Sequence, residues 1–92
     1  MNMEYARMRI YGRVQMVMFR DFVRRGAGRL ELAGYVKNLP DGSLEIIARG
    51  DKDKVRELFE RAKRGPVFAC VDKYEMDTIS LAEEFRDFKI LY

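Results

Sequence analysis

Histidine and tryptophan are absent from this chain of 92 residues, and it has one cysteine and two prolines. Without histidine, a Ser-His-Asp triad, a Cys-His pair and a histidine-ligated zinc site are all excluded. Any proton transfer must therefore use Asp, Glu, Tyr, Lys, the cysteine or the substrate itself. The cysteine, Cys70, cannot form an internal disulfide. It is expected to be a small buried apolar residue or an incidental surface thiol, and the chain is expected to be cytoplasmic.

Long apolar runs are also missing. The longest covers residues 67–71, far short of the roughly 20 residues that a membrane-spanning helix needs. The first four residues contain neither a basic stretch nor an apolar core, so we expect no signal peptide and no membrane partner.

The composition is that of one small folded domain over residues 1–92. Apolar residues make up 48% of the chain and charged residues 36%, which suits one core and a solvated surface. The net charge of +3 is a mild basic bias that suits an anionic ligand without implying nucleic acid.

Apolar spacing predicts two helices and five strands. Alternating residues indicate the strands, and Val55, Leu58, Phe59 and Ala62 recur at i, i+3, i+4 and i+7, as on one face of a helix. Pro40-Asp41-Gly42 is typical of a hairpin turn. The predicted elements are a strand over 6–12, a helix from Asp21 that Gly34 ends, strands over 35–39 and 43–49, a helix from Asp51 that Gly65-Pro66 ends, and strands over 73–78 and 85–92.

This order predicts an α+β fold of the ferredoxin-like βαββαβ type. It consists of an antiparallel sheet with two helices on one face, plus a short C-terminal strand. The turn from the first strand into the first helix is the candidate site, because a helix N-terminus and Arg20 just before it both favour an anion. From spacing alone, an ordinary turn with a surface arginine stays the simpler interpretation.

Two spaced motifs point to a family. Residues 12–20, Gly-Arg-Val-Gln-Met-Val-Met-Phe-Arg, resemble the first acylphosphatase motif, G-x-V-Q-G-V-x-F-R. Residues 34–50 resemble the second, G-aromatic-V-K/R-N-x-x-x-G-x-V-x5-G, and residues 85–92 are similar to the family's F-x-x-F-x-I-x-Y ending. The resemblance covers nearly the whole chain and implies a single acylphosphatase-like domain with the fold just predicted.

The resemblance implies hydrolysis of acyl phosphates to a carboxylate and inorganic phosphate, with no cofactor and no metal. Arg20 would bind the phosphate, and Asn38 would orient the attacking water. The backbone amides of Gln15, Met16, Val17, Met18, Phe19 and Arg20 would form the phosphate-binding loop. Asn cannot act as a base, so the water proton would pass to a phosphate oxygen of the substrate. The expected partner is therefore a small acyl phosphate or inorganic phosphate, bound by a monomer.

Nucleic-acid binding is the least favoured function, because no aromatic and basic stretch of the RNA-recognition type is present. Met16 and Glu31 stand where the family pattern has glycine. A left-handed Met16 would cost about 1–2 kcal/mol, and Glu31 suggests that the first helix ends differently. Two hypotheses therefore stay open: an acylphosphatase, slowed by its altered loop, or a non-catalytic or weakly active domain that binds phosphate or a protein partner.

Overall fold

The computed structural model of the chain describes residues 3–80 and 84–92. Residues 1 and 2, part of the segment without signal-peptide features, lie outside the described residues. The elements are β1 (Met3–Arg13), α1 (Val17–Arg29), β2 (Ala33–Asn38), β3 (Leu44–Asp51), α2 (Lys52–Arg64), β4 (Cys70–Thr78) and β5 (Phe88–Leu91). No helix in these described ranges is long and apolar enough to cross a membrane.

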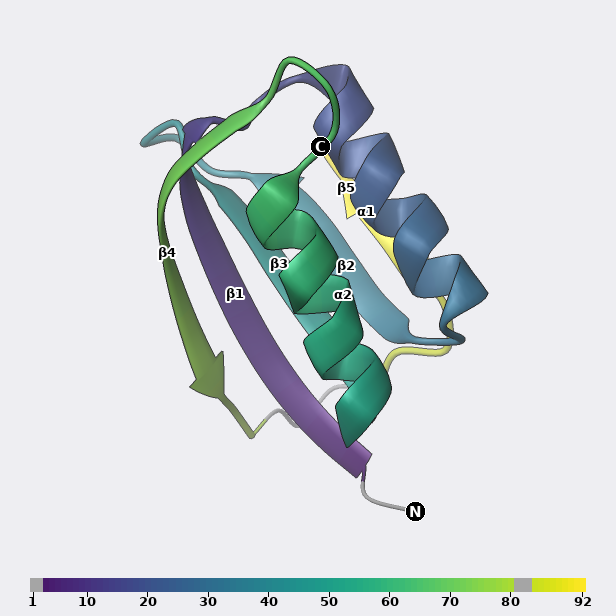
Figure 1. Ribbon diagram of the computed structural model, residues 1–92. Helices are drawn as coiled ribbons and strands as arrows, with labels where there is room; N and C mark the ends of the chain where they lie inside the picture. The colour runs from purple at the N-terminus through teal and green to yellow at the C-terminus, as the bar shows by residue number, and fades with distance from the viewer. Residues whose placement is uncertain (1–2, 81–83) are drawn as a thin grey trace.

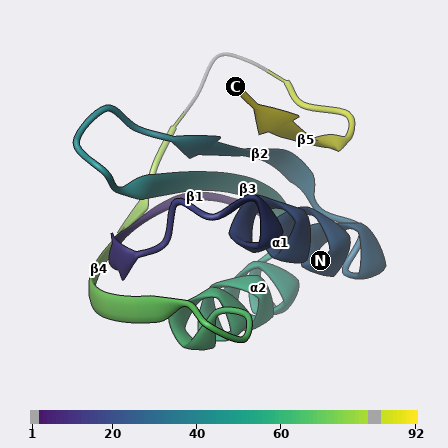
Figure 2. The same ribbon diagram turned by 90° about the horizontal axis from the view of Figure 1, so that it is seen from above.

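One five-stranded sheet has the order β4-β1-β3-β2-β5, and both helices cover the same face of it (Figure 1 and Figure 2). The predicted ferredoxin-like class is confirmed. The sheet is mixed rather than wholly antiparallel, because β5 pairs with β2 in parallel. β4 runs opposite to β2, so a strand that follows a single reversal of the chain after β4 must run parallel to β2.

The core lies between the sheet and the two helices. Its largest fully buried side chains come from β1, β3 and the helices, and they include Met8, Ile10, Phe19, Leu44, Ile46 and Leu58. Burial of this apolar surface is the main term that holds the layers together, at about 25 cal/mol per Å². The face of the sheet away from the helices is polar, with Tyr11 donating to Glu75 and Arg7 paired with Asp77.

Helix α1 begins one turn earlier than predicted, at Val17 rather than at Asp21. The apolar spacing that matters starts at Phe19 and continues through Val23 and Ala27, all of which are buried. Asp21 caps nothing. Its carboxylate instead pairs with Arg25 at 2.9 Å and with Arg24.

The end of α1 also differs from prediction. Gly34 does not stop the helix: it lies inside β2, where an added Cβ would come 1.9 Å from the Ile47 carbonyl oxygen. The helix ends at Arg29, and Glu31 itself takes the left-handed conformation with φ 57°. The Leu32 N–H donates to the Ala27 carbonyl, which completes a Schellman motif despite the missing glycine.

Helix α2 follows its prediction closely. Asp51 caps it by accepting a hydrogen bond from the Asp53 N–H at 2.8 Å, and the predicted apolar face is buried. Gly65 ends it.

The strands differ mainly in length: β1 and β4 start three residues earlier than predicted, while β5 is shorter than the range 85–92. The early start of β4 follows from its pairing with β1, which extends back to Cys70.

Candidate functional site

Several connections meet at one end of the molecule, at the top of Figure 1. The β1–α1 loop reaches the β2–β3 turn through Gln15, whose side-chain amide donates to the carbonyls of Leu39 at 2.6 Å and Ser43 at 2.9 Å. One side chain therefore fixes the distance between two loops that are remote in sequence. Each of these hydrogen bonds contributes about 1 kcal/mol.

The β2–β3 turn is itself held by hydrogen bonds. The hydroxyl and the backbone N–H of Ser43 both donate to the Asp41 carboxylate, and Ser43 is fully buried. These bonds, the hydroxyl first, lower the pKa of Asp41 below its ordinary value. The turn is thus built around an ionised carboxylate, and it presents firm carbonyl acceptors to Gln15.

The start of the β1–α1 loop requires a glycine for a packing reason. Gly12 has φ 125°, and an added Cβ would lie 2.3 Å from the Cys70 carbonyl oxygen. The register of β1 against β4 shifts at this point. The first glycine of the motif therefore allows β4 to pair closely with β1 at the foot of the loop.

The N-terminus of α1 has no side-chain cap. Its N-cap residue, Met16, is extended, with φ −101° and ψ 146°, and no acidic residue lies in the first turn. The costly left-handed conformation considered for this position is not adopted. The Phe19 N–H donates to the Met16 carbonyl at 2.9 Å, so this amide, one of the six expected in the phosphate-binding loop, is already hydrogen-bonded within the chain.

Arg20 lies in the first turn of α1. Its predicted position was just before the helix. Its Nε is buried and has no hydrogen-bond partner in the part of the chain that the structure describes. Its guanidinium carbon lies 4.8 Å from the ring centroid of Tyr92. The aromatic ring thus supports the cation without using its hydrogen-bond donors.

Asn38 is the last residue of β2, and its Oδ1 is buried without a partner among the described residues. In the parallel pairing of β2 with β5, Lys37 lies opposite Leu91. The residue after each, Asn38 and Tyr92, therefore lies at the same end of the sheet. Because Tyr92 also stacks on Arg20, the fold brings Arg20 and Asn38 to one end of the molecule.

Tyr92 lies at the candidate site, and no role for it was predicted from the sequence. Its position in the F-x-x-F-x-I-x-Y ending was the available signal. Alternation along a strand would put it on the same face as Phe88 and Ile90. Those two residues pack against the core, whereas Tyr92 is almost fully exposed.

The remaining predicted loop residues fall into different environments. Phe19 is fully buried and packs edge-to-face against Phe22 with centroids 6.2 Å apart, so its side chain anchors the loop. Val17 begins α1, and the Met18 side chain is 53% exposed. Close to them, the α2–β4 loop packs on Phe19: an added Cβ on Gly65 would lie 3.0 Å from Phe19 Cε2.

Cys70 is a surface thiol, the second of its two expected environments. Its hydrogen bond to Asp72 raises the pKa of the thiol, which disfavours the nucleophilic thiolate. No cluster of three or more metal-ligating side chains occurs within residues 3–80 and 84–92.

These groups together can bind an anion and orient a hydrogen-bond donor. The helix N-terminus and Arg20 attract negative charge, and Arg20 Nε is a donor. Asn38 Oδ1 is an acceptor, so it can accept from a water molecule but cannot remove its proton. A buried polar atom without a partner costs about 1–3 kcal/mol, and two of them at one end of the fold indicate a ligand site.

Comparison with known proteins identifies the family of the chain. The acylphosphatase family model matches residues 6–90. A curated acylphosphatase from Caldivirga maquilingensis is 48% identical over 88 residues, which cover 95% of this chain and 93% of that protein. A crystal structure of acylphosphatase from Bacillus subtilis and a structure of an acylphosphatase from Coxiella burnetii both superpose with a TM-score of 0.90. The first is 35% identical and covers 99% of this chain and all of its own; the second is 36% identical and covers 98% and 94%. The chain therefore belongs to the acylphosphatase family.

Proposed function

We propose that this member of the family hydrolyses the carboxyl–phosphate bond of acyl phosphates, with Arg20 and Asn38 as its reactive pair. The observation that carries the proposal is that Arg20 Nε and Asn38 Oδ1, both buried and without a partner among the described residues, lie at the end of the fold where α1 begins without a side-chain cap. A donor and an acceptor of this kind match the two reactants, a phosphate dianion and a water molecule.

In the proposed reaction, the phosphate lies at the N-terminus of α1 against the Arg20 guanidinium and the backbone amides of residues 15–18. Asn38 Oδ1 accepts a hydrogen bond from the attacking water and aims its oxygen at phosphorus. The new bond forms from water oxygen to phosphorus, and the bond from phosphorus to the acyl oxygen breaks. The water proton passes to a phosphate oxygen, and the electron pair of the broken bond leaves with the carboxylate.

Positioning and charge stabilisation supply the rate in this scheme. A carboxylate is a good leaving group, so no protein acid is needed. Gln15 and Phe19 serve as positioning residues, because one ties the loop to the β2–β3 turn and the other anchors it in the core. We further propose that the protein acts as a monomer in the cytoplasm without binding nucleic acid, and light scattering on the purified protein tests its oligomeric state.

Turnover of benzoyl phosphate in the presence of a chelator tests the function directly. We expect hydrolysis of benzoyl phosphate and acetyl phosphate, with no comparable turnover of an unactivated phosphate ester. Arg20→Ala should lower kcat/KM at least about 1,000-fold, as expected when a charged anion-binding donor is lost.

Arg24→Ala is the matched control, since this arginine lies one turn along α1 and pairs with Asp21 at the surface. It should keep activity within about twofold, because a surface ion pair contributes little. A pure, folded protein without turnover would contradict the proposal.

A second candidate function is protein interaction through an apolar surface. It is favoured by three exposed apolar side chains in the first turn of α1 and on the α2–β4 connection: Met18, Val67 at 70% and Phe68 at 77% exposure. Exposed Met and Phe side chains are common at binding surfaces. Turnover that depends on Arg20 separates the two functions, because a pure interaction domain has no reason to require it.

A further inference from the structure

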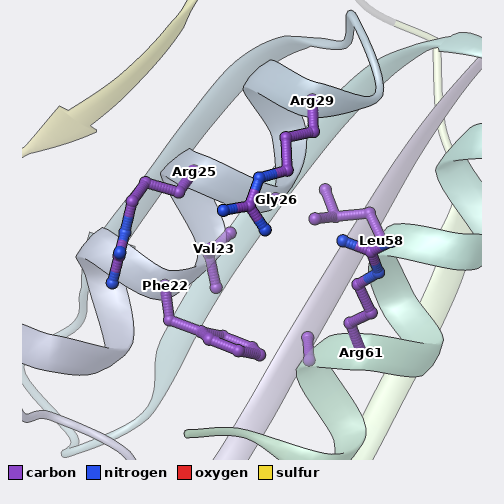
Figure 3. Close-up of a pocket in the computed structure, with 8 residues that line it drawn as sticks. Phe22, Val23, Arg25, Gly26, Arg29, Leu58 and Arg61 are labelled. Atoms are coloured by element: carbon purple, nitrogen blue, oxygen red, sulfur yellow. The ribbon is translucent and has the colours of Figure 1, made fainter.

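A small groove lies between helices α1 and α2, on the helical side of the molecule. Its volume is about 130 Å³. Its apolar walls come from both helices, and its rim carries three arginines; the lining residues are Phe22, Val23, Gly26, Leu58 and Ala62 with Arg25, Arg29 and Arg61 (Figure 3). Apolar walls under a cationic rim suit a ligand with an apolar body and a negative charge.

Gly26 lets the two helices approach closely beside the groove. An added Cβ there would lie 3.3 Å from Leu58 Cδ1, so the Leu58 side chain would have to shift by a few tenths of an ångström, and the new methyl group would take up part of the groove. A cavity of about 150 Å³ is known to accept benzene, so the groove has the size of one six-membered ring. Glycine weakens a helix by about 1 kcal/mol relative to alanine, and helix stability alone gives no reason for it here.

No acidic residue lines the groove, so none of its three arginines is paired with a carboxylate inside it. Arg61 pairs with Glu57 and Arg25 with Asp21, both on their own helices. Arg29 has no ion pair or hydrogen bond among the described residues. Figure 3 shows Arg29 and Arg61 facing each other across the groove, whereas Arg25 lies along the outer side of α1.

The wider field strengthens this local charge. Helix α1 carries four arginines against one aspartate, and α2 carries six basic residues against three acidic ones. Since the net charge of the whole chain is only +3, the strands and loops together are net negative. Positive potential is therefore concentrated on the helical layer, where it raises the local concentration of anions.

We propose that this interhelical groove is a second anion site, which binds a small organic anion with one ring-sized apolar body, such as an aromatic carboxylate. The ring would lie in the groove against Phe22 and over Gly26, with the buried Val23 and Leu58 beneath it, and the carboxylate would lie between Arg29 and Arg61. The site is separate from the phosphate-binding end, because Arg29 lies about 13 Å along the helix axis from Arg20. It does not depend on the proposed hydrolysis.

A nuclear magnetic resonance titration with benzoate at constant ionic strength tests the proposal. Saturable shifts are expected in the methyl signals of Val23 and Leu58. Acetate has the charge without the ring, and benzamide has the ring without the charge, so both should shift these signals far less. Equal effects of benzamide and benzoate, or benzoate shifts confined to residues 14–20, would overturn the assignment.

Two variants locate the ligand within the groove. Arg29→Gln should weaken benzoate binding at least about fivefold, whereas Arg56→Gln, at an exposed arginine of α2 outside the groove, should leave it unchanged. Gly26→Ala should weaken binding at least about fivefold, because its methyl group would take up part of the groove, while the protein stays folded, as a thermal melt would report. Unchanged affinity in both Arg29→Gln and Gly26→Ala would refute the site.

Discussion

The two ends of helix α1 differ in whether their polar groups are hydrogen-bonded. At the C-terminal end, the N–H groups of Glu31 and Leu32 donate to the Gly28 and Ala27 carbonyls at 3.2 and 2.9 Å. At the N-terminal end, Met16 supplies no side-chain cap, and the buried Nε of Arg20 has no partner among the described residues.

This difference separates stability from function along a single helix. The C-terminal end satisfies its backbone even at the expense of a left-handed glutamate, so changes there should alter the free energy of unfolding. The N-terminal end keeps donors unused, as a binding site must, and changes there should alter turnover. The predictions below test whether the two effects can be separated.

After Arg20, the largest expected effect belongs to Asn38, which lies at the same end of the molecule. Asn38→Ala should lower kcat about 100-fold or more, because the water loses the acceptor that orients it, while KM for benzoyl phosphate stays within about threefold. The unfolding free energy should be unchanged or higher, since the variant removes a buried acceptor without a partner. Steady-state kinetics and urea unfolding measure the two quantities.

Asn38→Asp sharpens the same test, because it keeps the shape and adds a negative charge near the phosphate. It should raise KM as well as lower kcat. A catalytic rate that survives either substitution would remove Asn38 from the reaction, and a large loss of stability would give it a structural role instead.

Gln15 should show a mixed effect, because it belongs to the N-terminal end but acts through packing. Gln15→Ala removes two hydrogen bonds to the β2–β3 turn. It should lower the unfolding free energy by about 1–2 kcal/mol and the rate about tenfold as the loop loses its anchor. Gln15→Glu keeps the shape but cannot donate to either carbonyl, so it should be equally damaging. Full activity in both variants would show that the tether does not position the loop.

Much of the fold and the place of the candidate site could be predicted from the sequence. The element order, the buried face of α2 and the position of the candidate site at the β1–α1 turn followed from apolar spacing and two motifs. What could not be predicted depends on contacts between distant segments. Phe19 opens the apolar face of α1 because Gly65 and the core surround it. β5 lies parallel to β2 because β4 runs opposite to β2 and the chain reverses once after β4. Tyr92 reaches Arg20 for the same reason.

At the C-terminal end, Glu31→Gly should stabilise the protein by about 1 kcal/mol, because glycine adopts φ 57° without the penalty of a Cβ. The ion pair of Glu31 with Lys54 spans 3.8 Å at the surface and offsets little of this gain. Glu31→Ala keeps the Cβ and should give no such gain. Activity should be unchanged in both variants. Equal stability of Glu31→Gly and Glu31→Ala in urea unfolding would show that the left-handed backbone is not strained.

The smallest effect is expected at Met16, although it is the most conspicuous departure from the family motif. Met16 is extended, at φ −101°, a conformation in which a Cβ costs nothing, so glycine has no strain to relieve there. Met16→Gly should therefore change kcat/KM by no more than about threefold. It should also lower the unfolding free energy by about 0.5–1 kcal/mol, because glycine loses more backbone entropy on folding. Met16→Ala, which keeps the Cβ and shortens the side chain, separates the backbone from the thioether. A tenfold rise in rate with glycine but not with alanine would show that turnover needs a loop conformation that methionine forbids.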